Sequence, residues 1–378
     1  MSHTITLALY IGIIVVTTVL GFVSQKMVTN DNGETTSLFR KTPFCAAILV
    51  AWLFIAFTKI GVDYNNYYYI IRQESWSTFT SIWSVESGFG LLCVVIKQIV
   101  GGNADQVIFI LKTLTILFTF LAIYSVRNKI IVGYAVFAYM TLAYLPSFYL
   151  LSLAIAMSVV FMAMAYFMNR HKYIIPIILL IIAGQLHNAV YIFIPVFLAL
   201  YFLERSKRAS NLVKTLLFIS YIAVGFFSGQ IYSIAQRSIA GFHYNNYATN
   251  TFSGSGIMII ILYAPLAFLI YMMLKYDLTE SQKNRIFIFS LSSLLFNVLS
   301  YRFIVIERME FLLLSLYVLF IPEVLYSSGI IKHGVKVRYK SFTWIVFALY
   351  MLFRAYLVFS ERTTMVSGMG EYEFFFPF

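Results

Sequence analysis

Charged side chains are scarce in this chain. Only 11% of its 378 residues are Asp, Glu, Lys or Arg, whereas a soluble domain carries about 25%. Hydrophobic residues make up 61% and aromatic residues 18%, and no polar stretch is long enough to form a separate soluble domain. The composition therefore predicts an all-α polytopic integral membrane protein, in which residues 1–378 form a single transmembrane helical domain.

Cysteine is also scarce, and its pattern excludes two further classes of protein. Cys45 and Cys93 lie in apolar runs without a second cysteine or a histidine at metal-binding spacing, so we expect no disulfide framework and no thiolate metal site. The sequence also lacks a P-loop, a dinucleotide fingerprint and a zinc-protease signature. We therefore expect neither ATP-driven nor nicotinamide chemistry, and neither a cofactor nor a metal.

Long apolar runs recur along the whole chain. A hydrocarbon core about 30 Å thick requires roughly 20 helical residues, which predicts roughly 11 to 14 transmembrane helices here. The apolar runs are Ile5–Val23, Phe44–Phe57, Phe89–Ile99, Val107–Ser125, Ile130–Met168, Tyr173–Phe202, Leu216–Ile234, Ile257–Leu274, Ile286–Leu299, Phe311–Tyr326 and Phe342–Phe359. The first run lacks a basic amino-terminal region and an A-x-A cleavage site, so we expect it to be retained as a helix.

Two of these runs are too long for a single helix across the membrane. Pro146 lies near the middle of Ile130–Met168, which predicts a helical hairpin that turns at Leu145-Pro146-Ser147. The centre of Tyr173–Phe202 is polar and contains His187, which predicts two short helices that meet at this histidine.

The distribution of Lys and Arg predicts the orientation. The net charge is +12, but most basic residues lie in short loops between apolar runs, a pattern typical of cytoplasmic loops and not of a nucleic-acid-binding surface. The remaining loops hold only Arg72, Arg237, Arg302, Arg308 and Arg362, so we place these loops, including 61–86 and 235–256, and both chain ends outside. If loops alternate in this way, an odd number of helices must cross between the outer loop after Phe57 and the inner Arg127, but two apolar runs lie there. We therefore expect the short run Phe89–Ile99, which contains Lys97, to be a re-entrant or interfacial helix.

Arginines on the outer side need an anionic partner. Arg302 and Arg308 are the strongest candidates for phosphate binding, because a planar guanidinium binds phosphate bidentately. A pyrophosphate-linked lipid would need several such donors. The alternative for either arginine is an ion pair with Glu307 or Glu310. Arg354, in the outer half of the last helix, is a further candidate, unless its side chain only reaches to the lipid headgroups.

Two residues are candidates for a general base. Asp63 starts the first outer loop and could remove a proton from a sugar hydroxyl, or it could simply cap a turn. His187 is the other candidate, or it is a buried histidine satisfied by Asn188 or a backbone carbonyl. Glu86 could hydrogen-bond a sugar, pair with an arginine, or be a solvated loop residue.

The tetrapeptide Tyr-Asn-Asn-Tyr occurs twice in the predicted outer loops, beginning at Tyr64 and at Tyr244. Aromatic rings that stack and amides that bind hydroxyls are what a sugar site requires, although coincidence is a strong alternative in a chain with 28 tyrosines. Tyr64 and Tyr244, together with Arg72, Glu86 and Arg354, are the candidate substrate-binding residues.

Several short segments together suggest a family. They are Gly61-Val62-Asp63-Tyr64-Asn65-Asn66-Tyr67, Glu86-Ser87-Gly88-Phe89, Gln185-Leu186-His187-Asn188-Ala189, Arg302 and Arg308 through Met309-Glu310-Phe311, and the tail Phe376-Pro377-Phe378. In this arrangement the sequence resembles the bacterial Wzy/EpsG-type polysaccharide polymerases. That family often has an Arg-Gln pair before the histidine region, where this chain has Ser147 to Ser152 and so lacks one expected phosphate-binding arginine.

The resemblance implies a metal-independent membrane glycosyltransferase with a GT-C-like architecture in the bacterial plasma (inner) membrane. It would join undecaprenyl-pyrophosphate-linked oligosaccharide repeat units at the outer face into an O-antigen, capsule or exopolysaccharide, with a chain-length regulator as a candidate partner. Arg302, Arg308 and Arg354 would hold the leaving pyrophosphate, and Asp63 or His187 would take the proton from the acceptor hydroxyl.

Two rival functions stay open. A flippase or transporter of lipid-linked oligosaccharide would normally show inverted repeats and paired broken helices, and this sequence has one convincing break, at His187. A membrane acyltransferase that modifies surface glycans would need a catalytic histidine on the outer side. His187 would fit that role, but no anchor for a cytoplasmic acyl donor is visible.

Overall fold

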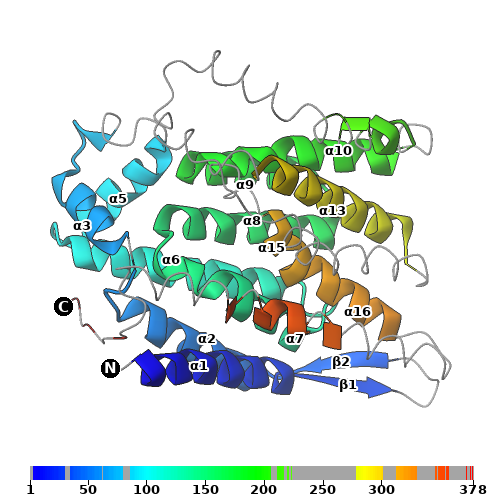
Figure 1. The fold of residues 1–378 in the computed structure, drawn as a ribbon, viewed down its shortest axis with the longest axis horizontal. Coiled ribbons are helices and arrows are strands. Elements are labelled where there is room, and N and C mark those ends of the chain that lie inside the picture. The colour runs from blue at the N-terminus through cyan, green and yellow to red at the C-terminus, as the bar shows by residue number, and fades with distance from the viewer. Residues whose placement is uncertain are drawn as a thin grey trace.

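The computed structural model describes residues 3–29, 35–61, 63–79, 86–205, 278–300 and 312–329, with short pieces between 211 and 223 and between 345 and 356, and the single residues 372, 375 and 377. Over this part of the chain the fold is a bundle of helices (Figure 1). The predicted class, an all-α polytopic membrane protein, is confirmed. One difference is a small antiparallel hairpin of β1 (Gln25–Thr29) and β2 (Thr35–Phe39) between the first two helices, rich in the β-branched residues that favour strands.

Four of the described helical segments are long and apolar enough to cross a membrane. They are Ile5–Val23 within α1 (His3–Val23), α6 (Ala104–Ser125), α8 (Leu151–Arg170) and the segment Asn188–Arg205, which contains the 3₁₀ turn η3 (Asn188–Ile192) and α10 (Phe193–Arg205). Shorter apolar helices include α2 (Lys41–Ala56), α5 (Ser87–Ile99), α7 (Val132–Tyr139) and α9 (Ile174–Leu186). The chain is therefore built from apolar helices of unequal length.

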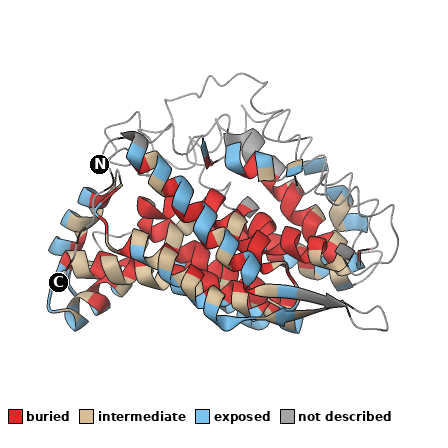
Figure 2. Cartoon of the chain, turned by 90° about the horizontal axis from the view of Figure 1, so that it is seen from below, coloured by how far each residue is buried: buried red, intermediate tan, exposed pale blue. Residues whose placement is uncertain are grey.

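Helix α8 forms the centre of the bundle. Inside the protein, 83% of its apolar stretch is buried, compared with 33% for α1, and it packs against α6 on one side and α9 on the other (Figures 1 and 2). Small side chains of α8 such as Ala156 and Ala163 are fully buried, and small residues allow helices to approach closely. Ile174 and Ile178 of α9 are exposed instead, so this face is suited to lipid.

Both predicted breaks are confirmed. After α7 the chain passes through a π-helical turn, η1 (Met140–Tyr144), and the 3₁₀ turn η2 (Pro146–Phe148) before it reverses into α8, because Pro146 has no backbone N–H with which to continue the helical hydrogen bonds. The backbone of His187 is extended, with φ −155° and ψ 118°, and ends α9. Tyr173, just before α9, packs on Tyr201 of α10 with ring centroids 4.9 Å apart, so the two helices form a hairpin with His187 near its tip.

Helix α5 does not cross the bundle. Its 13 residues span roughly 20 Å, less than a hydrocarbon core. Lys97, near its end, donates to the carbonyls of Ile71 and Arg72 at the end of α3 (Tyr64–Gln73), at 2.9 and 2.7 Å, and to that of Glu74 at 2.8 Å. Figure 1 shows α3 and α5 together at the same end of the molecule as both chain termini. This geometry favours the interfacial interpretation of the run Phe89–Ile99.

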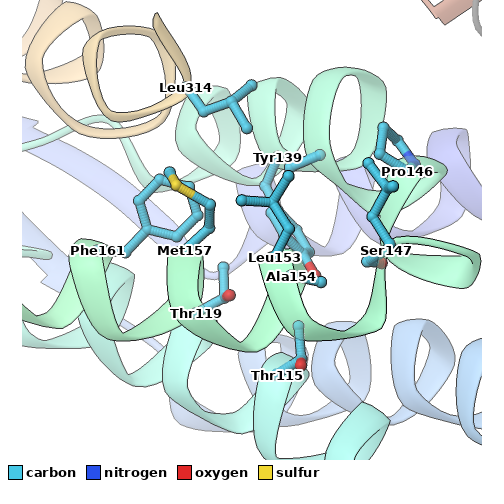
Figure 3. Close-up of a pocket in the computed structure, with 12 residues that line it drawn as sticks. Thr115, Thr119, Tyr139, Pro146, Ser147, Leu153, Ala154, Met157, Phe161 and Leu314 are labelled. Atoms are coloured by element: carbon cyan, nitrogen blue, oxygen red, sulfur yellow. The ribbon is translucent and has the colours of Figure 1, made fainter. Parts of the chain in front are cut away.

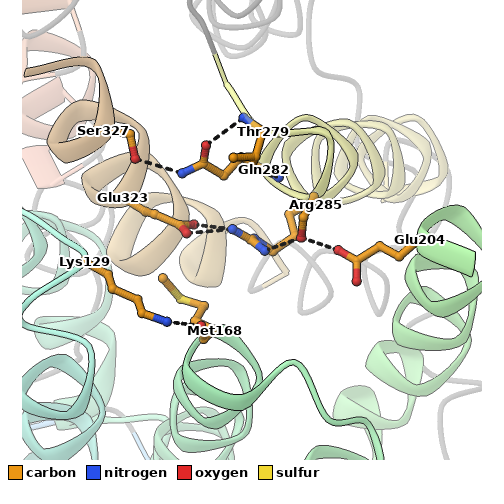
Figure 4. A network of polar contacts seen from close by, with 9 residues as sticks. Lys129, Met168, Glu204, Thr279, Gln282, Arg285, Glu323 and Ser327 are labelled. Carbon is orange, nitrogen blue, oxygen red and sulfur yellow. Dashed lines mark hydrogen bonds and ion pairs between the residues drawn. The ribbon is translucent and has the colours of Figure 1, made fainter. Parts of the chain in front are cut away.

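A second polar cluster joins helices at the opposite end. Arg285 of α13 (Glu280–Ser300) donates to both carboxylate oxygens of Glu323 in α16 (Ile321–Gly329), at 2.6 and 2.7 Å. Arg285 also donates to the hydroxyl of Ser281, 2.7 Å away, which donates to the carboxylate of Glu204 (Figure 4). Glu204 also accepts from the hydroxyl of Tyr173. These contacts, which we call the Arg285 cluster, tie α10, α13, α16 and the start of α9 together. Between α13 and α16 lie the short helix α15 (Leu312–Ser315) and the π-helical turn η5 (Leu316–Phe320).

Candidate functional site

A carboxylate and an imidazole meet where α5 begins and α9 ends. Nδ1 of His187 contacts Oε1 of Glu86, which occupies the N-cap position of α5. His187 is only 6% exposed, and its Nε2 is buried with no hydrogen-bond partner among the described residues. An ionised carboxylate only accepts hydrogen bonds, so in a neutral imidazole paired with it the hydrogen is on Nδ1 and the lone pair is on Nε2. The pair therefore presents an imidazole nitrogen that can accept a proton.

Glycines allow these two segments to approach each other. A Cβ on Gly88 would lie 2.6 Å from Cβ of Gln185, so only glycine fits where the first turn of α5 rests on the end of α9. A Cβ on Gly184 would likewise lie 2.4 Å from the ring of Tyr191. Ser87 donates to Oε1 of Gln185 at 3.3 Å, and Gln185 in turn bonds the hydroxyl of Tyr191. The sequence segments around Glu86 and His187 are thus built to lie against each other.

Two further side chains reach His187 from other helices. Oγ of Ser152, in the first turn of α8, lies 3.4 Å from Nδ1 of His187, and the hydroxyl of Tyr67 in α3 lies 3.1 Å from the same Oγ. The backbone N–H of Ser152 donates to the Tyr67 oxygen at 3.4 Å. We call Tyr67, Ser152, His187 and Glu86 the His187 cluster.

The hydroxyl of Tyr67 keeps its proton at neutral pH. Burial raises the pKa of Tyr67 to about 12, and the carboxylates of Glu86 and Asp63 add to this rise, although hydrogen bonds from Ser152 act in the opposite direction. The phenol is therefore available as a donor within the His187 cluster.

The structure separates the two candidate bases. Asp63 occupies the N-cap position of α3, where its side chain makes no capping hydrogen bond, and its backbone carbonyl accepts from the N–H of Tyr67 at 2.9 Å. It is half-buried and makes no hydrogen bond to His187 among the described residues. His187 is paired with Glu86 instead of the Asn188 side chain considered from the sequence. The histidine therefore has the geometry of an oriented base, whereas Asp63 lies one helical turn from Tyr67.

The remaining sequence candidates fall in different places. Tyr64 is buried and donates to Oδ1 of Asp105 in α6 at 2.5 Å, so its hydroxyl is already engaged. Arg72 is exposed in the last turn of α3. Arg302, Arg308, Arg354 and Tyr244, together with the loop 235–256, lie outside the described residues. The other predicted outer loop, 61–86, contains α3.

Sequence reasoning missed Ser152, and it also missed two buried ionisable groups near the same end. Lys112 in α6 is 1% exposed and donates to the carbonyl of Thr58 at 2.8 Å, just past the end of α2. Glu74, which follows α3, is 2% exposed, and its carboxyl oxygens have no hydrogen-bond partner within the described part of the chain. A lysine inside the apolar run Val107–Ser125 was a visible signal, whereas nothing local marks Ser152 or Glu74.

A pocket lies between α6, α8 and the π-helical turn after α7 (Figure 3). Its lining surface is mainly apolar, and the residues that line it include Thr115, Thr119, Tyr139, Ser147, Leu153 and Met157. None of the described residues that line it is charged, so this lining is not suited to phosphate. Within the described ranges, no group of three or more His, Cys, Asp or Glu is placed to hold a metal ion.

These observations define a multi-pass helical membrane protein with an oriented histidine at one end of its helical bundle. The chain belongs to the EpsG family, whose model matches residues 41–374. Membership of this family indicates a polysaccharide polymerase of the glycosyltransferase type in general terms. No curated protein and no solved structure matches the chain.

Proposed function

We propose that this protein polymerises undecaprenyl-pyrophosphate-linked oligosaccharide repeat units at the outer face of the bacterial plasma membrane, with His187 as the general base. The observation that carries the proposal is the pairing of Nδ1 of His187 with Glu86, which leaves Nε2 as a proton acceptor. Family membership supports the reaction class.

The reaction follows from this geometry. Nε2 of His187 takes the proton from a hydroxyl of one lipid-linked repeat unit, and that oxygen attacks the anomeric carbon of the growing glycan. The bond from this carbon to the pyrophosphate oxygen breaks, and the lipid pyrophosphate leaves with the bonding electrons. The Glu86 carboxylate stabilises the imidazolium that forms on His187, as a carboxylate does in other carboxylate–histidine pairs.

The leaving group needs positive charge that the His187 cluster does not contain. Arg302, Arg308 and Arg354 are our candidates for binding the pyrophosphate, because a bidentate guanidinium stabilises charge that develops on phosphate oxygens. Tyr244, Arg72 and Asp63 are candidates for binding the sugars. No step of this reaction requires a metal ion or a nucleotide sugar.

The length of α9 supports a lipid-linked substrate. Its 13 residues place His187 roughly 20 Å along the helix from its start, short of the thickness of a hydrocarbon core of about 30 Å. The reacting sugar must then reach below the outer membrane surface. A sugar attached to a lipid pyrophosphate can enter such a site sideways from the bilayer.

The proposal is tested with purified protein in lipid nanodiscs, EDTA, and the native undecaprenyl-pyrophosphate-linked repeat unit as the only substrate. We expect a ladder of repeat multiples on a gel, lost in His187→Ala and in Arg302→Ala or Arg308→Ala proteins that still elute as monodisperse particles. A single repeat unit from folded wild-type protein would contradict polymerisation and favour the flippase. Movement of the labelled unit across a vesicle membrane would then test that rival.

A further inference from the structure

We propose that Tyr67 and Ser152 are positioning residues that hold the His187 ring in the orientation needed for proton transfer. This inference rests on the proposed function, since it concerns the same base. It assigns a role to two side chains that do not themselves contact the reacting atoms.

A single hydrogen bond does not fix an imidazole. The second side-chain torsion of histidine has a broad energy profile, so a ring held only by Glu86 at Nδ1 can swing about that contact. Oγ of Ser152 lies 3.4 Å from the same nitrogen and approaches from α8, whereas Glu86 approaches from α5. Two acceptors on two different helices restrict the swing of Nε2.

The hydrogen-bond directions are consistent with this role. With the hydrogen on Nδ1, Ser152 Oγ shares it with Glu86 as a second and more distant acceptor, at 3.4 Å. The backbone N–H of Ser152 belongs to the first turn of α8, where helical N–H groups lack a partner within the helix, and it donates to the Tyr67 oxygen at 3.4 Å. The Tyr67 hydroxyl and Ser152 Oγ also share a hydrogen bond across 3.1 Å, in which either group can donate. Tyr67 therefore fixes the serine, and the serine fixes the histidine.

Ser152 differs from the other serines of the same region. Ser158 of α8 donates to the carbonyl of Ile155 at 2.7 Å, and Ser147 donates to that of Tyr144 at 2.5 Å, which is the usual local bond of a buried helical serine. The hydroxyl of Ser152 instead bonds side chains of α3 and of the turn after α9. A hydroxyl that bonds side chains from two other segments can hold those side chains in place relative to each other.

The experiment compares Tyr67→Phe and Ser152→Ala with two matched controls, Tyr68→Phe in the next position of α3 and Ser158→Ala six residues further along α8. Initial rates of repeat-unit addition are measured in nanodiscs over a range of substrate concentrations, which gives kcat and KM separately. We expect each test variant to lose on the order of tenfold in kcat with KM little changed, because misplacing a reacting group acts mainly on turnover. The controls keep the wild-type kcat.

Two further variants separate positioning from a general loss of structure. Ser152→Thr keeps the hydroxyl, so it should recover most of the kcat that Ser152→Ala loses. The double variant Tyr67→Phe with Ser152→Ala should be about as slow as the slower single variant, because residues that act in one chain of hydrogen bonds are not additive.

Wild-type kcat in Tyr67→Phe and Ser152→Ala overturns this inference, as does a loss that Ser158→Ala shares or that Ser152→Thr fails to recover. If the test variants are normal while His187→Ala is inactive, the proposed function stands and only the positioning role fails. If wild-type protein adds no repeat unit, the proposed function itself fails.

Discussion

Two polar clusters lie at opposite ends of the same apolar bundle, and they differ in the chemistry available to them. In the Arg285 cluster a guanidinium faces a carboxylate with two short hydrogen bonds. Arginine does not release its proton in proteins, so this cluster can only hold helices together. In the His187 cluster the cation is replaced by an imidazole, whose two nitrogens can donate and accept a hydrogen.

The comparison teaches how an apolar protein divides its few polar residues. The Arg285 cluster joins the ends of several helices and stabilises the bundle. The His187 cluster draws on α3, α5, α8 and the turn after α9, and among the described residues its Nε2 has no hydrogen-bond partner. A buried nitrogen with no partner is a cost for stability and is expected where chemistry requires it.

The largest expected effect separates the two clusters by activity. His187→Ala should lower the rate of polymerisation on the order of 100- to 10,000-fold, the usual contribution of a general base. His171→Asn is the matched control, because His171 lies at the end of α8 in a left-handed conformation, φ 51°, that Asn tolerates. Gel quantification of products checks both variants, and an active His187→Ala protein excludes this base.

The second-largest expected effect concerns stability, and it distinguishes the Arg285 cluster from the His187 cluster. Arg285→Ala leaves the buried Glu323 without its partner and should lower the free energy of unfolding by about 3–5 kcal/mol, the usual cost of breaking a buried ion pair. The double replacement Arg285→Met with Glu323→Leu should recover much of the loss. Thermal unfolding in detergent measures both, and an unchanged Tm in Arg285→Ala would show that the pair does not stabilise the bundle.

A smaller effect tests the charge of Glu86. Glu86→Gln keeps an oxygen that accepts from Nδ1 of His187 but removes the negative charge that stabilises the imidazolium. We expect kcat to fall on the order of tenfold, less than in His187→Ala, because one charge-assisted hydrogen bond becomes a neutral one. Equal kcat in Glu86→Gln and wild type, measured in the same nanodisc assay, would show that Glu86 acts only through packing.

The smallest effect concerns Glu74, a buried carboxyl near the His187 end that has no ion pair of the Arg285 kind. Burial raises the pKa of Glu74 to about 8, from 4.5, while Lys97 acts in the opposite direction. Between these two pH values the folded state binds the proton more tightly than the unfolded state, so the carboxyl lowers stability as the pH rises from about 4.5 to about 8. Glu74→Gln should therefore raise Tm relative to wild type above pH 8 and not below pH 4.5. A Tm difference that is independent of pH would contradict this account.

Local features of the sequence predicted much of the fold. Pro146 marked the turn between α7 and α8, and the polar segment at His187 marked the turn between α9 and α10, because both act on the backbone within a few residues. The short run Phe89–Ile99 gave α5, because helix length is fixed by the number of residues. The β1–β2 hairpin was missed, since a short segment of threonines and valines carries little signal against its apolar surroundings.

The candidate site was predictable only in part. His187 and Glu86 were both named from the sequence, but as separate residues with separate alternatives. Tyr67 was visible only as the end of a repeated tetrapeptide, and Ser152 only as part of a departure from the family pattern. Lys97 caps α3 from another helix, and no spacing in the sequence shows this.

The sequence by itself determined that the protein is a helical membrane protein and where its long apolar runs break. Composition, apolar run length and proline chemistry decide these features locally. Only the tertiary structure decided that Glu86 is the partner of His187 and that Ser152 and Tyr67 meet the same ring. Those contacts depend on the packing of α3, α5, α8 and α9, and the glycines at 88 and 184 allow the close approaches within it. Such packing brings together residues that no local sequence pattern connects.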